Sequence, residues 1–390
     1  MATQTDPVAR RDAEVRTALL LLVSAVVLVL FLVQATRGDV GGPDIFRFLR
    51  VARIAGPWRA VPIEYAPGEL LLIRGLFHTG TVETAAIRLA LVAFAAHVAT
   101  WGAVRWGWGR TAGERYLIAA LPLLLLLYER IDLVPVALAA WGLALAVRER
   151  PRGAGALLAA AVLTKLWPVV LLPGLLLRGG RRAGVWFGAG TGIGLVAWIA
   201  CGGSGAPGQV VTFRGATGWE AGSTVGALVW ILGGGPLRQE AGSARVGVAP
   251  VWARALLGVV LVSLLIVIWL RARRRDADPG GRSALASVAA LLLCTPLFST
   301  QYALWLLPWA GVTSARDRDA GALGAVLVVG LATAAIDLTG YEHGTELTAQ
   351  MATVIRIAGL AWLVVRELLP AATPGPARAA SLPGASSPPR

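Results

Sequence analysis

Residues that bind metal ions or form disulfides are scarce in this sequence. It has two cysteines, Cys201 and Cys294, and three histidines, His78, His97 and His343. Both cysteines fall at or within apolar stretches, and the histidines lack the spacing of metal ligands. The sequence therefore gives no sign of a disulfide framework or a metal cluster. We expect no cofactor, and leave a dependence on free metal ions open.

Nucleotide-binding and common hydrolase motifs are also missing. The chain contains no G-x-x-x-x-G-K-[ST] phosphate loop, no dinucleotide-binding glycine fingerprint, no G-x-S-x-G and no H-E-x-x-H. A cytoplasmic nucleotide site is therefore unsupported. Any chemistry must draw its energy from a lipid-borne or already activated substrate.

Charge is sparse, whereas long apolar runs are abundant. Charged residues make up 15% of the 390 residues, hydrophobic residues make up 56%, and the mean hydropathy is +0.67. Apolar runs long enough to cross a bilayer predict an all-α, polytopic transmembrane helical bundle of about 12 spans (11–13). The predicted spans are 17–35, 84–104, 116–128, 133–147, 154–164, 167–178, 184–200, 250–270, 284–298, 302–313, 320–337 and 349–366.

The chain divides into one large membrane domain with two short ends. We expect a cytoplasmic N-terminal segment at 1–16, an integral-membrane domain at 17–368 and a disordered cytoplasmic tail at 369–390. The tail is rich in Pro, Ala and Ser. The first span lacks a convincing cleavage site after it, so we interpret it as a retained helix rather than a signal peptide.

The net charge of +14 reflects membrane orientation better than nucleic-acid binding. In the alternating topology, 22 of the 36 basic residues fall in segments on the cytoplasmic side and 11 fall on the opposite side. This bias predicts a multi-pass plasma-membrane protein with both termini in the cytoplasm. Several spans are short, and the hairpins at 129–132, 164–168 and 299–302 all have outward tips. Short helices with tips on one side leave room for a cavity there.

The loop between the first two spans, 44–69, is the most heavily charged of the outward loops. It holds Asp44, Glu64 and Glu69 beside several arginines. The stretch 47–54 alternates arginines with apolar residues, a pattern that predicts an outward-facing interfacial helix. Prolines at 57, 62 and 67 then favour an extended path. The loop is either an amphipathic anchor with solvated charges or part of an active site, and the second interpretation is the stronger.

Lys165 is the only lysine among the 36 basic residues, in a chain that otherwise uses arginine. It stands at the tip of a predicted hairpin, just before Pro168. A compact ammonium can bind a phosphate oxygen, and a proline at a helix start leaves neighbouring amides free. The alternative is a lysine whose charge extends to the membrane surface. We favour the phosphate-binding role.

Other polar groups collect on the same predicted side. The second long outward loop, 202–249, contains Arg214, suited to phosphate, and Trp219 with Glu220, suited to a sugar. An apolar piece at 224–232 predicts a re-entrant or interfacial helix. Glu129, Arg130 and Asp132 fit a structural ion-pair cluster as well as a substrate site. Further polar groups on this side are Gln301, Tyr302 and His343, the last of which fits a surface position equally well.

These pieces together resemble the polyprenol-phosphate-mannose-dependent mannosyltransferases of glycosyltransferase family 87, which are membrane glycosyltransferases of superfamily C. The matching pieces are Asp44 with Phe48, the run Pro62-Ile63-Glu64-Tyr65-Ala66-Pro67, Arg130 with Asp132, Lys165-Leu166-Trp167-Pro168, Arg214-Gly215 followed by Trp219-Glu220, and Ser299-Thr300-Gln301-Tyr302 with Leu304-Trp305. The family pattern usually has proline where Ala66 and Thr300 stand, a departure that affects loop stiffness and acceptor fit.

The resemblance implies transfer of a sugar from a polyprenyl-phosphate donor to an extracytoplasmic glycolipid or glycan, with inversion. Mannose is the sugar that the resemblance favours. Asp44 would be the catalytic base, and Lys165 and Arg214 would bind the donor phosphate. The sugar and acceptor contacts would come from Glu64, Tyr65, Trp219, Glu220 and Gln301, with Arg130, Asp132 and His343 as secondary candidates.

Two rival classes remain open at this stage. A lipid or small-molecule transporter would place polar groups at mid-membrane and on both faces, with two related halves. A membrane protein with a purely structural role would need neither a single lysine at a hairpin tip nor a heavily charged first loop. We expect the partners to be membrane lipids, the lipid-linked donor and a glycan acceptor, and no nucleic acid.

Overall fold

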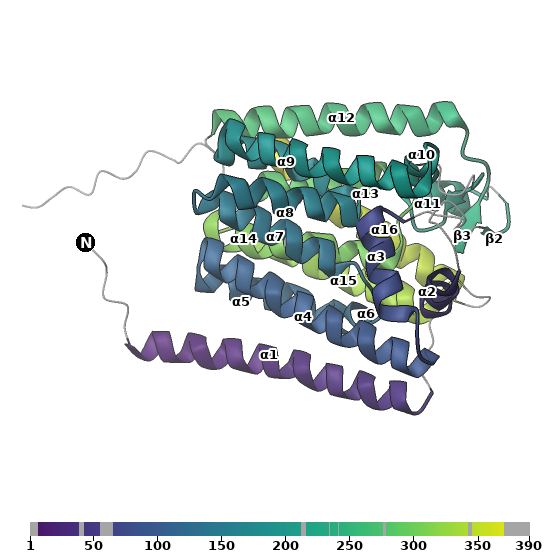
Figure 1. Ribbon diagram of the computed structural model, residues 1–390, viewed down its shortest axis with the longest axis horizontal. Coiled ribbons are helices and arrows are strands. Elements are labelled where there is room, and N and C mark those ends of the chain that lie inside the picture. The colour runs from purple at the N-terminus through teal and green to yellow at the C-terminus, as the bar shows by residue number, and fades with distance from the viewer. Residues whose placement is uncertain are drawn as a thin grey trace, which may run out of the picture.

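The computed structural model describes residues 7–38, 43–54, 65–211, 216–233, 235–240, 242–275, 278–341 and 345–369. Its long helices lie side by side along the longest axis, with α1 at one edge and α12 at the opposite edge (Figure 1). The helices are α1 (Pro7–Thr36), α2 (Pro43–Arg53), α3 (Pro67–Phe77), α4 (Val82–Trp108), α5 (Arg110–Ala120), α6 (Leu124–Leu127), α7 (Leu133–Val147), α8 (Pro151–Thr164), α9 (Leu172–Gly202), α10 (Ala206–Val211), α11 (Thr224–Ile231), α12 (Val251–Arg274), α13 (Arg282–Cys294), α14 (Leu307–Arg316), α15 (Ala320–Thr339) and α16 (Glu346–Leu368), with 3-10 turns η2 (Leu121–Leu123), η3 (Trp167–Leu171) and η5 (Thr300–Leu306).

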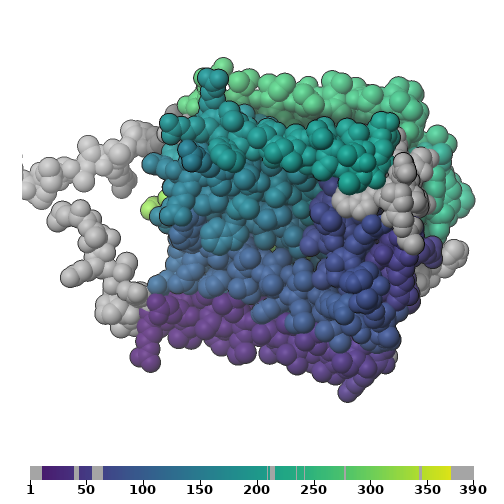
Figure 2. Space-filling model, viewed as in Figure 1, coloured from purple at the N-terminus to yellow at the C-terminus, as the bar shows by residue number. Residues whose placement is uncertain are grey.

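The outer helices expose large apolar side chains, as expected of a membrane protein. Leu22 in α1 is 58% exposed, Ile193 in α9 is 72% exposed and Val259 in α12 is 62% exposed. Figure 2 shows α1 and α12 as outer layers on opposite edges of the molecule. Such faces would be unfavourable in water and suit contact with lipid tails. The apolar composition is therefore explained by a helical bundle that faces lipid.

The predicted count of about twelve spans is not supported. Six helical segments in the described residues are long and apolar enough to cross a membrane: 11–36, 82–108, 167–202, 251–274, 320–339 and 346–368. Three further apolar helices, α7, α8 and α13, have only 15, 14 and 13 residues. A full crossing needs about 20 residues, so hydropathy alone counted these short helices as equal to complete ones.

Helix α9 joins two segments that the sequence analysis kept apart. Gly180 interrupts it with φ 61° and ψ −162°, a conformation open to glycine. A Cβ placed on Gly184 would lie 2.8 Å from the side chain of Leu176. Residues eight apart in an unbroken helix are about 12 Å apart along the axis. The chain therefore turns back at Gly180, and the part of α9 after it packs on α8 through Gly155, Gly190 and Gly194.

The first long loop forms two helices. The predicted interfacial helix is present as α2, where Ile45, Phe48 and Leu49 are buried while Arg50 is exposed. The second helix, α3, was not predicted. Pro67 stands at its first position, where a missing N–H costs nothing, so this proline starts a helix rather than extending a loop. Residues 55–64, with Pro57 and Pro62, lie outside the described part.

The second long loop combines a helix with a small sheet. The predicted helix at 224–232 is present as α11, and the Ser223 hydroxyl accepts from the Gly226 N–H at its start. Beside it lies an antiparallel sheet of β1 (Trp219–Glu220), β2 (Arg238–Glu240) and β3 (Ser243–Val246) in the order β1-β3-β2. This sheet corrects the all-α prediction, because strands of two to four residues are too short to show an alternating pattern.

The two ends of the bundle differ in chemistry. At one end α2, α3, α11, β2 and β3 gather, and the start of α1 lies at the other (Figure 1). The N-terminal end is held by ion pairs of arginines with buried carboxylates. Arg366 Nε lies 2.9 Å from Asp319 Oδ2, and Arg275 Nη1 lies 3.7 Å from Glu367 Oε2. The opposite end is where the short helices meet the long loops.

Candidate active site

Short helices end among polar groups at the loop-bearing end. At 1.5 Å per residue, α7, α8 and α13 are about 20–22 Å long, whereas α4, with 27 residues, is about 40 Å long. The segments at the ends of the short helices hold Asp132, Lys165 and η5, and these three are in contact with one another. The prediction that tips far apart in the sequence share one side is confirmed for these three.

Asp44 lies in the first turn of α2 and is held by two arginines. Arg130 Nη1 makes a close ion pair with Asp44 Oδ2, and Arg47 Nη2 lies 3.7 Å from Asp44 Oδ1. Arg130 also approaches Asp337 at 3.9 Å, and Asp337 accepts a 2.9 Å hydrogen bond from the Thr300 hydroxyl. One chain of charged contacts therefore links α2, the α6–α7 tip, α15 and η5 around Asp44.

Lys165 is held between two buried carboxylates. Its ammonium lies 2.9 Å from Asp132 Oδ1 and 3.6 Å from Glu69 Oε1, and 5.5 Å from the ring centre of Tyr302. Trp305 Nε1 donates to Asp132 at 2.9 Å. Burial alone would lower the pKa of Lys165, but Asp132 and Glu69 outweigh it and hold this pKa above its ordinary value. Lys165 does not extend to the surface, because only 18% of its side chain is exposed.

Stacked aromatic rings form a rigid wall beside Lys165. Trp167 and Trp305 stack at 5.0 Å with their planes 9° apart, and Tyr302 stacks on Trp305 at 4.1 Å. Trp167, two residues after Lys165, begins η3, while the other two rings come from η5. These contacts fix the position of η3 against η5 and thus the backbone that carries Lys165.

Glu220 occupies a buried position where the second loop meets η5. It accepts a close hydrogen bond from the Phe298 N–H and a 3.4 Å bond from the Ser299 hydroxyl. Burial raises the pKa of Glu220 despite these donors. Arg356 lies over the Phe298 ring at 3.9 Å and donates to the Gly222 carbonyl at 2.7 Å. Glu220 and Arg356 thus tie the second loop to the bundle.

The remaining predicted site residues occupy different settings. Tyr65 is buried, and its hydroxyl accepts a 2.6 Å hydrogen bond from Arg47 Nε, which joins it to the Asp44 network. Trp219 is buried in β1 opposite Val246, and Gln301 is partly buried in η5. Glu64, Arg214 and His343 lie outside the described residues.

The sequence analysis offered an ion-pair cluster among Glu129, Arg130 and Asp132. The structure shows ion pairs from this tip to other segments. Arg130 pairs with Asp44 and Asp337, whereas Asp132 pairs with Lys165, so the tip joins two different clusters. Burial raises the pKa of Glu129 above its ordinary value. The segment 129–132 therefore connects α2 to Lys165 and its carboxylates, in addition to joining two neighbouring helices.

Sequence reasoning assigned no role to Glu69, Asp337 or Arg356. The sequence does mark each of them, because an ionisable side chain within or beside an apolar helix costs free energy in a membrane unless another polar group pairs with it. Glu69 follows a proline at a helix start, Asp337 closes α15, and Arg356 lies inside α16. No group of three or more His, Cys, Asp or Glu side chains in the described residues could hold a metal ion.

Comparison with known proteins identifies the family. The model of Glycosyltransferase family 87 matches residues 65–300, more than half of the chain. This range includes Glu69, Lys165 and Glu220, while Asp44 precedes it. No curated protein and no solved structure matches the chain. The polar groups described above thus belong to a membrane glycosyltransferase, and the chain is a member of glycosyltransferase family 87.

Proposed function

We propose that the protein transfers mannose from a polyprenyl-phosphate donor to a glycolipid or glycan acceptor on the extracytoplasmic side, with inversion. The observation that carries this proposal is the position of Asp44. Its carboxylate is fixed by Arg130, which stands two residues before the Asp132 that pairs with Lys165. A transporter is not favoured, because the family to which the chain belongs transfers sugars.

Asp44 is the proposed catalytic base. Its Oδ1, the oxygen 3.7 Å from Arg47 Nη2, would take the proton of an acceptor hydroxyl while the oxygen of that hydroxyl bonds to the anomeric carbon of the donor sugar. The bond from this carbon to the phosphate oxygen breaks on the opposite face, which inverts the configuration. The polyprenyl phosphate leaves with the electron pair and needs no proton, so one base and one site for negative charge are enough.

Lys165 and Arg214 are the proposed ligands of the departing phosphate. An ammonium has three N–H groups, and two of those of Lys165 face Asp132 and Glu69. The third N–H of the ammonium is the one left for a phosphate oxygen. The two carboxylates would therefore orient the ammonium toward the phosphate as well as partly neutralise its charge. Glu64, Tyr65, Trp219, Glu220 and Gln301 are proposed to contact the donor sugar or the acceptor, with Arg130, Asp132 and His343 in support.

The experiment is transfer by the purified enzyme in lipid nanodiscs, with radiolabelled polyprenyl-phosphate mannose and a membrane lipid extract as acceptor. Asp44→Asn is expected to lower transfer about 10²- to 10⁴-fold, because an amide keeps the size of the side chain but cannot take the proton. Donor binding should persist. Asp39→Asn, at a carboxylate five residues earlier and outside the described residues, is the control and should remain active.

Two outcomes would contradict this assignment. An inactive Asp39→Asn beside an active Asp44→Asn would move the base five residues back. Normal transfer by both variants would reject the mechanism, and transfer of a sugar other than mannose by the wild type would reject the donor.

A further inference from the structure

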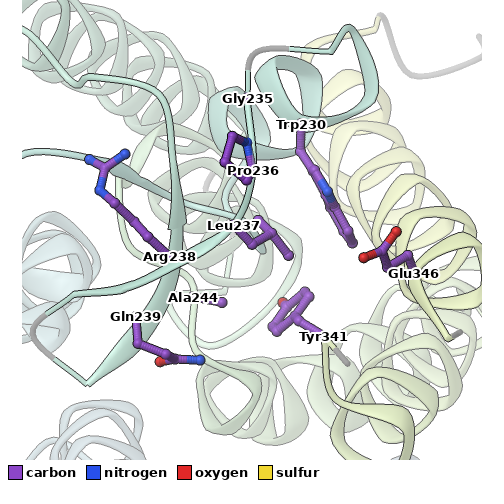
Figure 3. A pocket seen from close by; sticks show the side chains of 9 residues that line it. All are labelled: Trp230, Gly235, Pro236, Leu237, Arg238, Gln239, Ala244, Tyr341 and Glu346. Carbon is purple, nitrogen blue, oxygen red and sulfur yellow. The ribbon is translucent and has the colours of Figure 1, made fainter. Parts of the chain in front are cut away.

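A cavity of about 370 Å³ lies between β2, α11 and the start of α16. Figure 3 shows the rings of Trp230 and Tyr341 and the carboxylate of Glu346 gathered on one side of it. The amide of Gln239 approaches from the opposite wall, with Leu237 between them. The volume lies at the small end of the roughly 300–1,000 Å³ range of small-molecule sites. None of these residues belongs to the site described above.

The aromatic wall of this cavity is held in place. Trp230 and Tyr341 make an edge contact with ring centres 5.7 Å apart and planes at 71°. Burial raises the pKa of Tyr341 to about 12, despite the neighbouring Arg356 guanidinium. The hydroxyl of Tyr341 therefore stays protonated at physiological pH and can donate a hydrogen bond.

The strand wall is held by Glu240 at the end of β2. Its carboxylate accepts from the Thr217 N–H at 2.5 Å and the Gly218 N–H at 3.1 Å, and these bonds lower its pKa to about 2. Arg238 donates to the same carboxylate at 3.2 Å, and its side chain points away from the centre of the cavity (Figure 3). The Arg238 guanidinium thus binds Glu240 and does not face the cavity. The polar groups that face the cavity are the neutral amide of Gln239 and the carboxylate of Glu346.

The cavity lies next to the Asp44 network on two sides. Tyr341 follows Asp337 by four residues, so their Cα atoms are at most about 14 Å apart, and Asp337 contacts Arg130, the partner of Asp44. On the other side, the turn between β2 and β3 approaches α2. A Cβ placed on Gly242 would lie 3.0 Å from Arg47 Nη1. These contacts connect the walls of the cavity to the residues that hold Asp44.

We propose that this cavity binds a sugar residue of the acceptor other than the one whose hydroxyl reacts. Aromatic rings supply apolar faces for a sugar ring, while an amide and a carboxylate pair with its hydroxyls. Glu346 disfavours a phosphate, so the occupant is a neutral carbohydrate rather than the donor phosphate. The cavity lies among the loops and strands, away from the apolar helix faces that would take a lipid tail. This inference rests on the proposed function, since an acceptor glycan must lie beside Asp44.

The first test measures binding without catalysis. Saturation-transfer NMR would use the wild type in nanodiscs with α-linked disaccharides of mannose, galactose and glucose. We expect signal from at least one of them, lost in Trp230→Ala and kept in Trp186→Ala, a half-exposed tryptophan in α9. Gln239→Ala, at an exposed position, covers the case in which Trp230→Ala fails to fold, and Gln34→Ala is its control. No signal from any disaccharide, or equal signal in all variants, would overturn the proposal.

The second test measures transfer. Trp230→Ala and Gln239→Ala are expected to raise the KM for acceptor about tenfold, the effect of losing one good contact, while the donor KM and the kcat stay near wild type. A rise in the donor KM instead would overturn the acceptor assignment. If the wild type binds disaccharides but transfers no mannose, the proposed function fails while the sugar site stands. If it transfers mannose and the variants behave as wild type, only the cavity proposal fails.

Discussion

Lys165 shares its charge with two carboxylates that have little access to water. The side chains of Asp132 and Glu69 are 4% and 6% exposed, and the three groups together carry one net negative charge. Removal of one partner from a buried ion pair costs about 3–5 kcal/mol, because the remaining charge is left uncompensated. A loss of activity in a simple Lys165 variant would therefore mix misfolding with lost phosphate binding.

A neutral replacement of the whole cluster separates these two effects. We predict that Lys165→Met alone lowers the thermal unfolding temperature, and that adding Glu69→Gln and Asp132→Asn restores most of it. Transfer should stay low in the triple variant, because no cation is left to stabilise the departing phosphate. The measurements are thermal unfolding in nanodiscs and transfer at saturating donor. Recovery of both stability and transfer would show that Lys165 serves only to balance its neighbours.

The position of Lys165 could be predicted from its rarity, but its partners could not. A lone lysine at a hairpin tip shows in the sequence, whereas Glu69 comes from a helix nearly a hundred residues earlier in the chain. The same holds for Asp44, whose assignment rested on family resemblance while Arg130 and Asp337 emerge only from packing. Contacts between distant segments depend on helix register and depth, which composition and spacing do not encode.

At the level of elements, Gly68 sets how closely α3 approaches α8. A Cβ there would lie 2.8 Å from Thr164 Oγ1 and 2.9 Å from Thr164 Cα, so the backbones themselves would have to separate. Gly68 precedes Glu69, and Thr164 precedes Lys165. The close approach of these two helices thus brings the carboxylate to the ammonium.

Alanine at two glycines of α3 should have opposite effects. Gly75, in the same helix, has nothing within 4 Å of an added Cβ. We expect Gly75→Ala to stabilise the protein by about 0.5–1 kcal/mol through lower backbone entropy of the unfolded chain. Gly68→Ala should destabilise it by about 1–3 kcal/mol and reduce transfer, because α3 must move from α8. Thermal unfolding of both variants would check this, and similar shifts in the two would contradict the close-packing explanation.

Elements with strong local patterns were predictable and the others were not. The mixed arginine and apolar pattern gave α2, and the apolar run at 224–232 gave α11. Helix α3 was missed because three prolines at 57, 62 and 67 favoured an extended chain, although proline is also favoured at the first position of a helix. The small sheet depends on side-chain bonds such as those of Glu240, which link residues more than twenty positions apart.

At the scale of the whole molecule, the two ends of the bundle have different charge patterns. One end gathers the arginine-rich turns and the buried carboxylates Asp319 and Glu367 that pair with them. The other holds the two long loops and Lys165 with its buried carboxylates. Composition predicted a helical membrane bundle, but it overestimated the number of full spans because short apolar helices look like crossings in a hydropathy profile.

The positive-inside rule gives this polarity a testable direction. In a background with Cys201 and Cys294 replaced by serine, one cysteine at Leu232 and one at Arg274 would report the two ends. Leu232 follows α11 at the loop-bearing end and is 81% exposed, whereas Arg274 is exposed in the last turn of α12 at the arginine-rich end. We expect an impermeant maleimide to label Leu232→Cys in intact cells and Arg274→Cys only after permeabilisation. The reverse result would place Asp44 and Lys165 on the cytoplasmic side. It would leave the family assignment intact but exclude an extracytoplasmic acceptor, because the base and the proposed phosphate ligand pair with the same tip between α6 and α7.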